Sequence, residues 1–107
     1  MFTNILLSAG MLILASLVPP DVNKLDVLFQ TSGLCPSGTP IELTVYKMAG
    51  DEGDTPVVLA WSRGGLPLAA LDRTSNRIYI YKEKKEYPLD ELMERYPTPC
   101  DIPHSDL

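Results

Sequence analysis

The sequence predicts a small α+β protein: an antiparallel β-rich domain of about five strands, in a meander or a small barrel, with one C-terminal helix, preceded by an N-terminal apolar helix. Three observations predict this class. The chain opens with an uncharged apolar segment, its middle alternates short apolar runs with turn sequences, and near residue 88 the apolar period becomes that of a helix. Because 107 residues suffice for one folded domain, we divide the chain into residues 1–20 and a β-rich domain of residues 21–107.

The N-terminal segment is apolar from Ile5 to Val18, and no charged residue occurs before Asp21. As an α-helix this run would be about 21 Å long, against about 30 Å for the hydrocarbon core of a membrane. An uncleaved signal anchor, a cleaved signal peptide and a helix buried in a soluble fold all stay open. We favour the anchor, because no convincing cleavage site precedes the two prolines that would end the helix. The predicted membrane or assembly helix contains Ile5, Leu6, Leu7, Ala9, Gly10, Leu12, Ile13 and Leu14.

Five short apolar segments follow, and each is typical of a strand. They are Leu25–Phe29, Ile41–Tyr46, Pro56–Trp61, Leu66–Leu71 and Arg77–Lys82. In the second, Ile41, Leu43 and Val45 alternate with more polar residues, which indicates a strand with one buried face. In the fifth, the same alternation places Tyr79 and Tyr81 on the face opposite the two isoleucines.

The connections between these segments predict how the strands pair. Residues 50–54, 62–65 and 72–76 are of hairpin length and rich in Gly, Asp, Ser and Asn. Strands joined this closely pair with their sequence neighbours in antiparallel fashion, because a parallel return needs a long crossover. Residues 31–40 are predicted to form a loop, and Lys82–Glu86 a solvated link to the helix.

One amphipathic helix is predicted from Pro88 to Tyr96. Its apolar residues recur at helical spacing, and it contains acidic residues early and Arg95 late, which complements the helix dipole. Pro88 suits the first helical position and Pro97 ends the helix. Residues 96–103 contain three prolines, so we expect them to run extended across the surface and the tail after them to fray.

The two cysteines, Cys35 and Cys100, lie near the two ends of the β-rich domain. If the chain is exported they meet an oxidising compartment, and one disulfide is the natural pairing. Such a bridge would stabilise the fold by about 4 kcal/mol through loop closure. Two free thiols are the alternative, whereas metal or redox chemistry lacks a C-x-x-C motif and has only His104 as a further ligand.

The amino-acid composition, and the catalytic motifs that the sequence lacks, argue against several classes of function. Nine Lys and Arg against 14 Asp and Glu give a net charge of -5, which argues against a nucleic-acid partner. A nucleophile paired with histidine could use only His104, and no sequence matches a phosphate-binding loop. We therefore predict no enzyme activity, no cofactor and no metal site. A small hydrolase that uses His104 or paired acids is the least favoured hypothesis.

Function is then expected to reside in surfaces. The residues predicted to contact a partner are Tyr79, Tyr81, Trp61, Asp51 and Asp54, although core packing is the better interpretation for Trp61. The first hypothesis is a non-catalytic accessory or structural subunit that acts through protein–protein contacts in a membrane complex or larger assembly. Its N-terminal helix would tether it to a membrane, with the body in an extracytoplasmic space such as the periplasm, a lumen or the outside. The alternative is a secreted binding or inhibitor module with a cleaved signal peptide.

Overall fold

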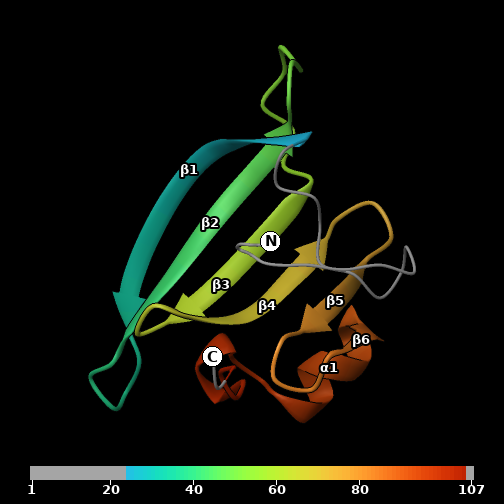
Figure 1. The fold of residues 1–107 in the computed structure, drawn as a ribbon. Coiled ribbons are helices and arrows are strands. Elements are labelled where there is room, and N and C mark those ends of the chain that lie inside the picture. Colours follow the sequence, from blue (N-terminus) through green and yellow to red (C-terminus); the bar gives the residue numbers. More distant parts are fainter. Residues whose placement is uncertain (1–23, 106–107) are drawn as a thin grey trace.

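The computed structural model describes residues 24–105, so the predicted N-terminal helix lies outside the described residues. One six-stranded antiparallel sheet is followed by one α-helix and a short 3-10 helix, as Figure 1 shows. This confirms the predicted small antiparallel β-domain with one C-terminal helix. The elements are β1 (Leu25–Leu34), β2 (Pro40–Met48), β3 (Val58–Arg63), β4 (Leu66–Asp72), β5 (Arg77–Ile80), β6 (Lys85–Pro88), α1 (Leu89–Arg95) and η3 (Pro99–Asp101).

The sheet is a meander, because its spatial order β1 to β6 is also the order of the sequence. Four of the five connections have five residues or fewer and return the chain directly beside the strand it has just left, whereas the β2–β3 loop, residues 49–57, is longer than the predicted 50–54. Gly64 and Gly65 form the turn between β3 and β4 with φ angles of 60° and 82°, a backbone conformation that residues with a Cβ adopt at a cost. Register shifts occur in β1 between Val27 and Phe29, and in β3 between Trp61 and Ser62.

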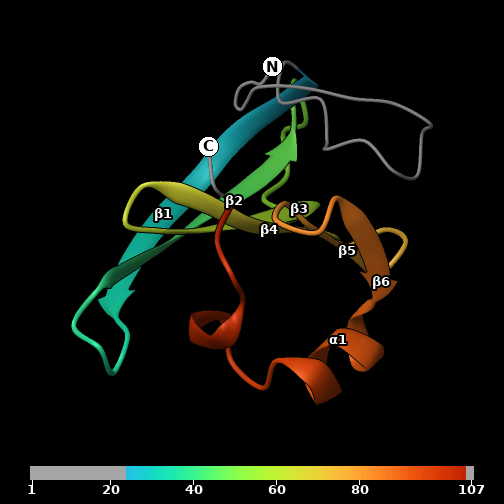
Figure 2. The same cartoon turned by 60° about the horizontal axis from the view of Figure 1, so that its bottom comes forward.

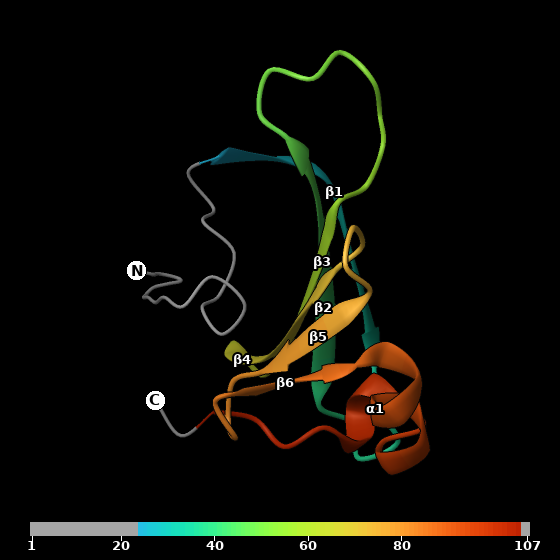
Figure 3. The same ribbon diagram turned by 90° about the vertical axis from the view of Figure 1, so that its right-hand side faces the viewer.

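The core lies on one face of the sheet, under α1 and the segment that follows it. Figures 2 and 3 show both on the same side of the strands. The predicted alternation in β5 explains this face, because Ile78 and Ile80 are buried while Tyr79 and Tyr81 point the other way. The central cluster contains Leu68, Ala69, Leu71, Ile78, Ile80, Tyr87, Leu92 and Ile102.

Parts of three predicted connections are strands. Ser62 and Arg63, expected in a turn, are the last residues of β3. Residues 31–34, expected in a loop, extend β1 and pair with the start of β2, so only residues 35–39 form the turn. Lys85–Pro88, within and just after the predicted link, is β6, in which Tyr87 opposes Ile78 and enters the core. Residues 81–84 form the turn, where Lys84 has a φ of 55°, so β5 ends at Ile80 and not at Lys82.

The C-terminal segment also differs from the prediction. Residues 96–103 do not run extended throughout, because Pro99–Asp101 forms η3, whose Asp101 carboxylate accepts hydrogen bonds from the Thr98 N–H (3.3 Å) and hydroxyl (3.2 Å). Ile102 is buried in the core. The Ser105 N–H donates to the Pro67 carbonyl at 3.1 Å. The expected fraying is therefore wrong for the tail up to Ser105, which an apolar anchor and a backbone hydrogen bond hold in place.

The predicted disulfide is confirmed. Cys35 and Cys100 are joined, with 5.7 Å between their Cα atoms and a sequence separation of 65. The bond ties the β1–β2 turn to η3. Nearby, a guanidinium nitrogen of Arg63 donates to the Cys100 carbonyl at 2.6 Å, which fixes η3 to the end of β3 as well.

Glu83, in the turn between β5 and β6, fastens that turn to α1. Its carboxylate accepts hydrogen bonds from the hydroxyls of Tyr87 and of Tyr96, the latter at 3.0 Å. Arg95 lies 3.6 Å from the same carboxylate and 4.9 Å from the centre of the Tyr87 ring. The hydrogen bond from Tyr87, followed by that from Tyr96 and the charge of Arg95, lowers the pKa of Glu83.

We expect this cluster to make stability fall in acid. A carboxyl whose pKa is lower in the folded protein stabilises the fold fully above its ordinary value of 4.5, and this contribution is lost as the pH falls from there through the folded pKa. Thermal melts of Glu83→Gln should therefore show a weaker dependence on pH below 4.5 than the wild type, and a loss of about 1 kcal/mol at neutral pH. Parallel pH profiles for both proteins would contradict this assignment, and Glu94→Gln on exposed α1 is the control.

Candidate functional site

One edge of the sheet is long, open and apolar. β1 has ten residues and, within residues 24–105, pairs only with β2, so its other side carries unpaired backbone groups. Figure 1 shows β1 at the edge of the sheet far from α1. Five large apolar side chains are exposed among the described residues, and three of them are on β1: Val27 (54%), Phe29 (51%) and Leu34 (73%).

The strand at the opposite edge of the sheet, β6, is shorter than β1 and has a larger share of charged residues. β6 has four residues and contains Lys85, Glu86 and Pro88. A short strand with charges and a proline is the usual protection of a sheet edge against a further strand. β1 has less protection: besides its register shift it contains one charged residue, Asp26, near its start, and no charged residue occurs between Asp26 and Glu42.

Two backbone hydrogen bonds at the ends of β2 show which way its backbone groups face. The Ala49 N–H donates to the Lys24 carbonyl at 3.0 Å, on the β1 side. The Gly64 N–H donates to the Pro40 carbonyl at 3.0 Å, on the β3 side. Because backbone groups alternate along an antiparallel strand, odd-numbered residues of β2 bond to β1 and even-numbered residues bond to β3.

The register then identifies the open backbone groups of β1. Ile41, Leu43 and Val45 oppose Gly33, Thr31 and Phe29, so these three β1 residues bond to β2. The β1 residues that alternate with these three direct their N–H and C=O groups to the open edge. They are Gln30, Ser32 and Leu34.

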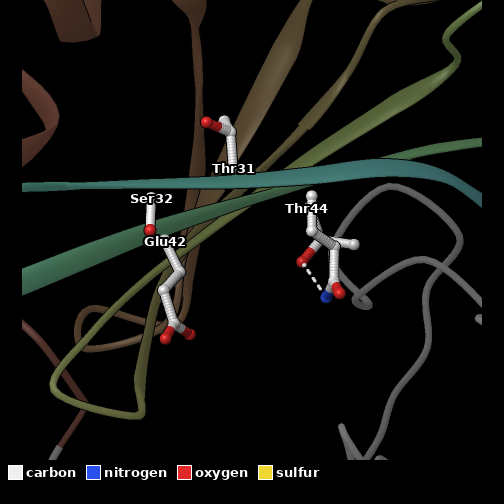
Figure 4. Close-up of a pocket in the computed structure, with 5 residues that line it drawn as sticks. Thr31, Ser32, Glu42 and Thr44 are labelled. Atoms are coloured by element: carbon white, nitrogen blue, oxygen red, sulfur yellow. Dashed lines mark hydrogen bonds between the residues drawn. The ribbon is translucent and has the colours of Figure 1, made fainter.

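A shallow polar hollow of about 250 Å³ lies over β1 and β2. The amide of Gln30 donates to the Thr44 hydroxyl at 3.1 Å, and in Figure 4 Ser32 and Glu42 point away from Thr31, which lies on the other face. Glu42 is its one charged residue and accepts a hydrogen bond from Ser62 at 3.3 Å. The hollow offers hydrogen-bonding groups beside the open backbone.

On the other face, an apolar hollow of about 190 Å³ adjoins the same edge. Its lining includes Gly33 and Thr31 from β1, Leu43 from β2, Trp61 from β3 and Pro99 from η3. Trp61 is half-buried and packs against the core cluster, so core packing accounts for much of its surface. A strand added to β1 would meet polar groups on one face and apolar groups on the other.

The predicted tyrosine pair is close-packed. The rings of Tyr79 and Tyr81 lie edge to face with 5.1 Å between their centroids. Burial, with the neighbouring Tyr79 and Tyr46, raises the pKa of Tyr81. Both rings are half-buried on the face opposite Ile80, so they expose less surface than separate tyrosines would.

The five predicted contact residues do not form one site. Trp61 is in register with Ala69 and Ile80, so it lies on the core face, opposite Tyr79. Asp51 and Asp54 are exposed in the loop between β2 and β3, where the Asp51 carboxylate accepts the Gly53 N–H at 3.2 Å. The β1 edge was not among the predicted contacts, although the uncharged run after Asp26 is a signal for it.

His104 lines an open hollow of about 500 Å³ with Ser37, Thr39 and Arg63. Its Nδ1 lies 2.8 Å from the Ser105 carbonyl oxygen. Within residues 24–105, no three His, Cys, Asp or Glu side chains gather as metal ligands would. In the same range no helix is long and apolar enough to cross a membrane.

The chain was compared with known families, proteins and structures. No family model, no curated protein and no solved structure matches it. Its function is therefore inferred from the geometry of the described residues and from the sequence.

Proposed function

We propose that this chain is a non-catalytic accessory or structural protein that acts through protein–protein contacts at the open edge of β1. The observation that carries the proposal is that edge itself: ten residues, three exposed apolar side chains and outward backbone groups at Gln30, Ser32 and Leu34. Exposed edges of this kind bind an added strand through main-chain hydrogen bonds, while pockets beside them select its side chains. The hollows on both faces of β1 suit the second role.

The tyrosine pair and the loop of Asp51 and Asp54 are proposed as secondary contacts. Tyr79 and Tyr81 offer two phenol groups, yet much of each ring packs against the other and the sheet. The loop is exposed but its Lys47 neighbour donates to the Asp51 carbonyl at 2.7 Å, which neutralises part of the local charge. Neither offers a row of open backbone groups, so the edge is the stronger candidate.

We place the body in an extracytoplasmic space. The Cys35–Cys100 disulfide supports this placement, because disulfides persist in oxidising compartments. Residues 1–20 are proposed as a membrane anchor that keeps the body beside a membrane complex. The alternative is a secreted binding or inhibitor module whose first residues are removed.

The mass of the mature protein distinguishes these two forms. For the anchored form we expect the full mass of 11.8 kDa, with Met1 or its processed equivalent present, in a fraction that needs detergent for extraction. A soluble protein lacking about 20 N-terminal residues would instead support secretion. Intact-mass spectrometry after membrane fractionation makes the measurement.

Site-specific photo-cross-linking tests the contact at β1. A photoreactive residue is placed at Ser32 in the full chain, produced in its native cell and purified through the C-terminus in mild detergent. Because the backbone of Ser32 faces the open edge and its side chain lines the polar hollow beside it, we expect a discrete protein adduct there. The same residue at Glu94, exposed on α1, is the matched control and should give none.

A second variant tests whether formation of the adduct depends on the edge of β1. Replacing Phe29 by Lys places a charge on the apolar strand, as protected edges do, and should abolish the Ser32 adduct. Circular dichroism of F29K checks that the sheet is intact. No adduct at Ser32 in a folded chain, or equal adducts at Ser32 and Glu94, would contradict the proposed function.

A further inference from the structure

We infer that the strand added to β1 is β1 of a second copy of this chain, so that two six-stranded sheets join across a two-fold axis. This inference rests on the proposed contact at the β1 edge and names its partner. Two-fold dimers need a surface that complements itself. The edge of an antiparallel strand meets this need, because its outward N–H and C=O groups alternate in the same way in both copies.

Charge favours a second copy at this edge. The chain has a net charge of -5, so repulsion between two copies is smaller where they meet through an uncharged surface. No residue from Val27 to Ile41 is charged, and this run includes most of β1. The Glu42 side chains would lie three strand spacings apart, about 14 Å, which exceeds the screening length of about 8 Å at physiological salt.

The open backbone groups allow a two-fold axis at Thr31. With the axis at Thr31, Gln30 of one copy opposes Ser32 of the other, and both direct their N–H and C=O groups outward. Each such pair forms two hydrogen bonds, and the axis generates it twice. Thr31 then opposes its own copy in a pair without direct hydrogen bonds, where side chains approach most closely.

The side chains fit the same register. Phe29 opposes Gly33 of the other copy, on the face that carries Thr31. Phe29 is half exposed, and a Cβ placed on Gly33 would meet nothing within 4 Å, so there is space above the glycine. An aromatic ring packed over a cross-strand glycine fills such a gap. On the other face, Leu34, which is 73% exposed, would lie near the register shift of the other copy's β1, between Val27 and Phe29.

Charged substitutions at Thr31 test this register, because residue 31 of one copy opposes residue 31 of the other copy only when the axis lies at Thr31. Wild type is expected to sediment at twice 11.8 kDa in density-matched detergent. Thr31→Lys and Thr31→Asp, each alone, should weaken the dimer at least about tenfold, since like charges then face each other. An equimolar mixture of the two should restore a heterodimer. Glu94→Lys, a charge change on exposed α1, should leave the dimer intact.

The outcomes separate this inference from the proposed function. A monomeric wild type, a dimer that survives Thr31→Lys, or a mixture that fails to recover would each overturn the self-pairing. If the Ser32 adduct then contains a different protein, the contact at the edge stands and only its partner was wrong. If no adduct forms either, both the inference and the proposed function fail.

Discussion

Removing the disulfide, in the variant C35S/C100S, is expected to lower the free energy of unfolding by about 4 kcal/mol. The bond closes a loop of 65 residues, so its loss greatly enlarges the freedom of the unfolded chain. Small domains have a total stability of about 5–15 kcal/mol, so the loss removes a large share of it. Chemical denaturation of the full chain in mild detergent measures the difference.

Two controls separate the covalent bond from the serine side chains. Wild type treated with a reductant should show the same loss as the double variant, because both lack the bond. Ser37→Ala, in the same β1–β2 turn and exposed, should change stability by no more than about 0.5 kcal/mol. A double variant as stable as oxidised wild type would show that the bridge does not hold the fold.

Replacing Ile80 by Ala is expected to cost about 2–5 kcal/mol of stability. Ile80 is fully buried at the centre of the core cluster, beside Leu68, Ala69 and Ile78. The substitution removes apolar surface from the core and leaves a cavity that the sheet and α1 cannot readily close. Thermal unfolding followed by circular dichroism gives the difference.

Met93→Ala is the matched control for this prediction. Met93 is also a large apolar residue, but it is 58% exposed on α1, so its truncation should change stability by no more than about 0.5 kcal/mol. Equal losses for the two variants would mean that the core does not lie between the sheet and α1. A loss at Ile80 alone locates the core on the face described above.

Most of the sheet could be predicted because its patterns are local. The alternation of Ile41, Leu43 and Val45, and that of Ile78 with Ile80, follows from one buried face and can be recognised without any partner. The disulfide could be predicted because the chain has one pair of cysteines and was expected to be exported to an oxidising compartment. The helix was located within one residue, since Pro88 stands just before its first residue, Leu89.

The missed elements depend on contacts between distant residues. Ser32 and Gly33 are typical turn residues, yet pairing with β2 keeps them extended. The charged residues around Tyr87 conceal β6, whose place is set by the pairing of Tyr87 with Ile78. Burial of Ile102 then holds a tail whose sequence resembles a loose end.

The candidate site was missed for the same reason. Ending the first strand at Phe29 hides the length of the edge, and therefore the outward backbone groups at Ser32 and Leu34. The predicted tyrosines do lie on the face opposite the buried isoleucines, but a sequence cannot show that Tyr79 and Tyr81 cover one another. A contact surface formed by backbone groups does not require particular residue types, so it produces no sequence motif.

The link between Cys35 and Cys100 also determines how the molecule would respond to pulling at its two ends. Tension applied between the N- and C-termini passes directly from Cys35 to Cys100, so β2 to β6 and α1 bear no load while the covalent bond lasts. Among the elements of residues 24–105, only β1 precedes the link, and tension at the N-terminus would peel it from β2. Under oxidising conditions the mechanically weak element is thus the strand that carries the open edge, and the 65-residue loop behind it is shielded from force.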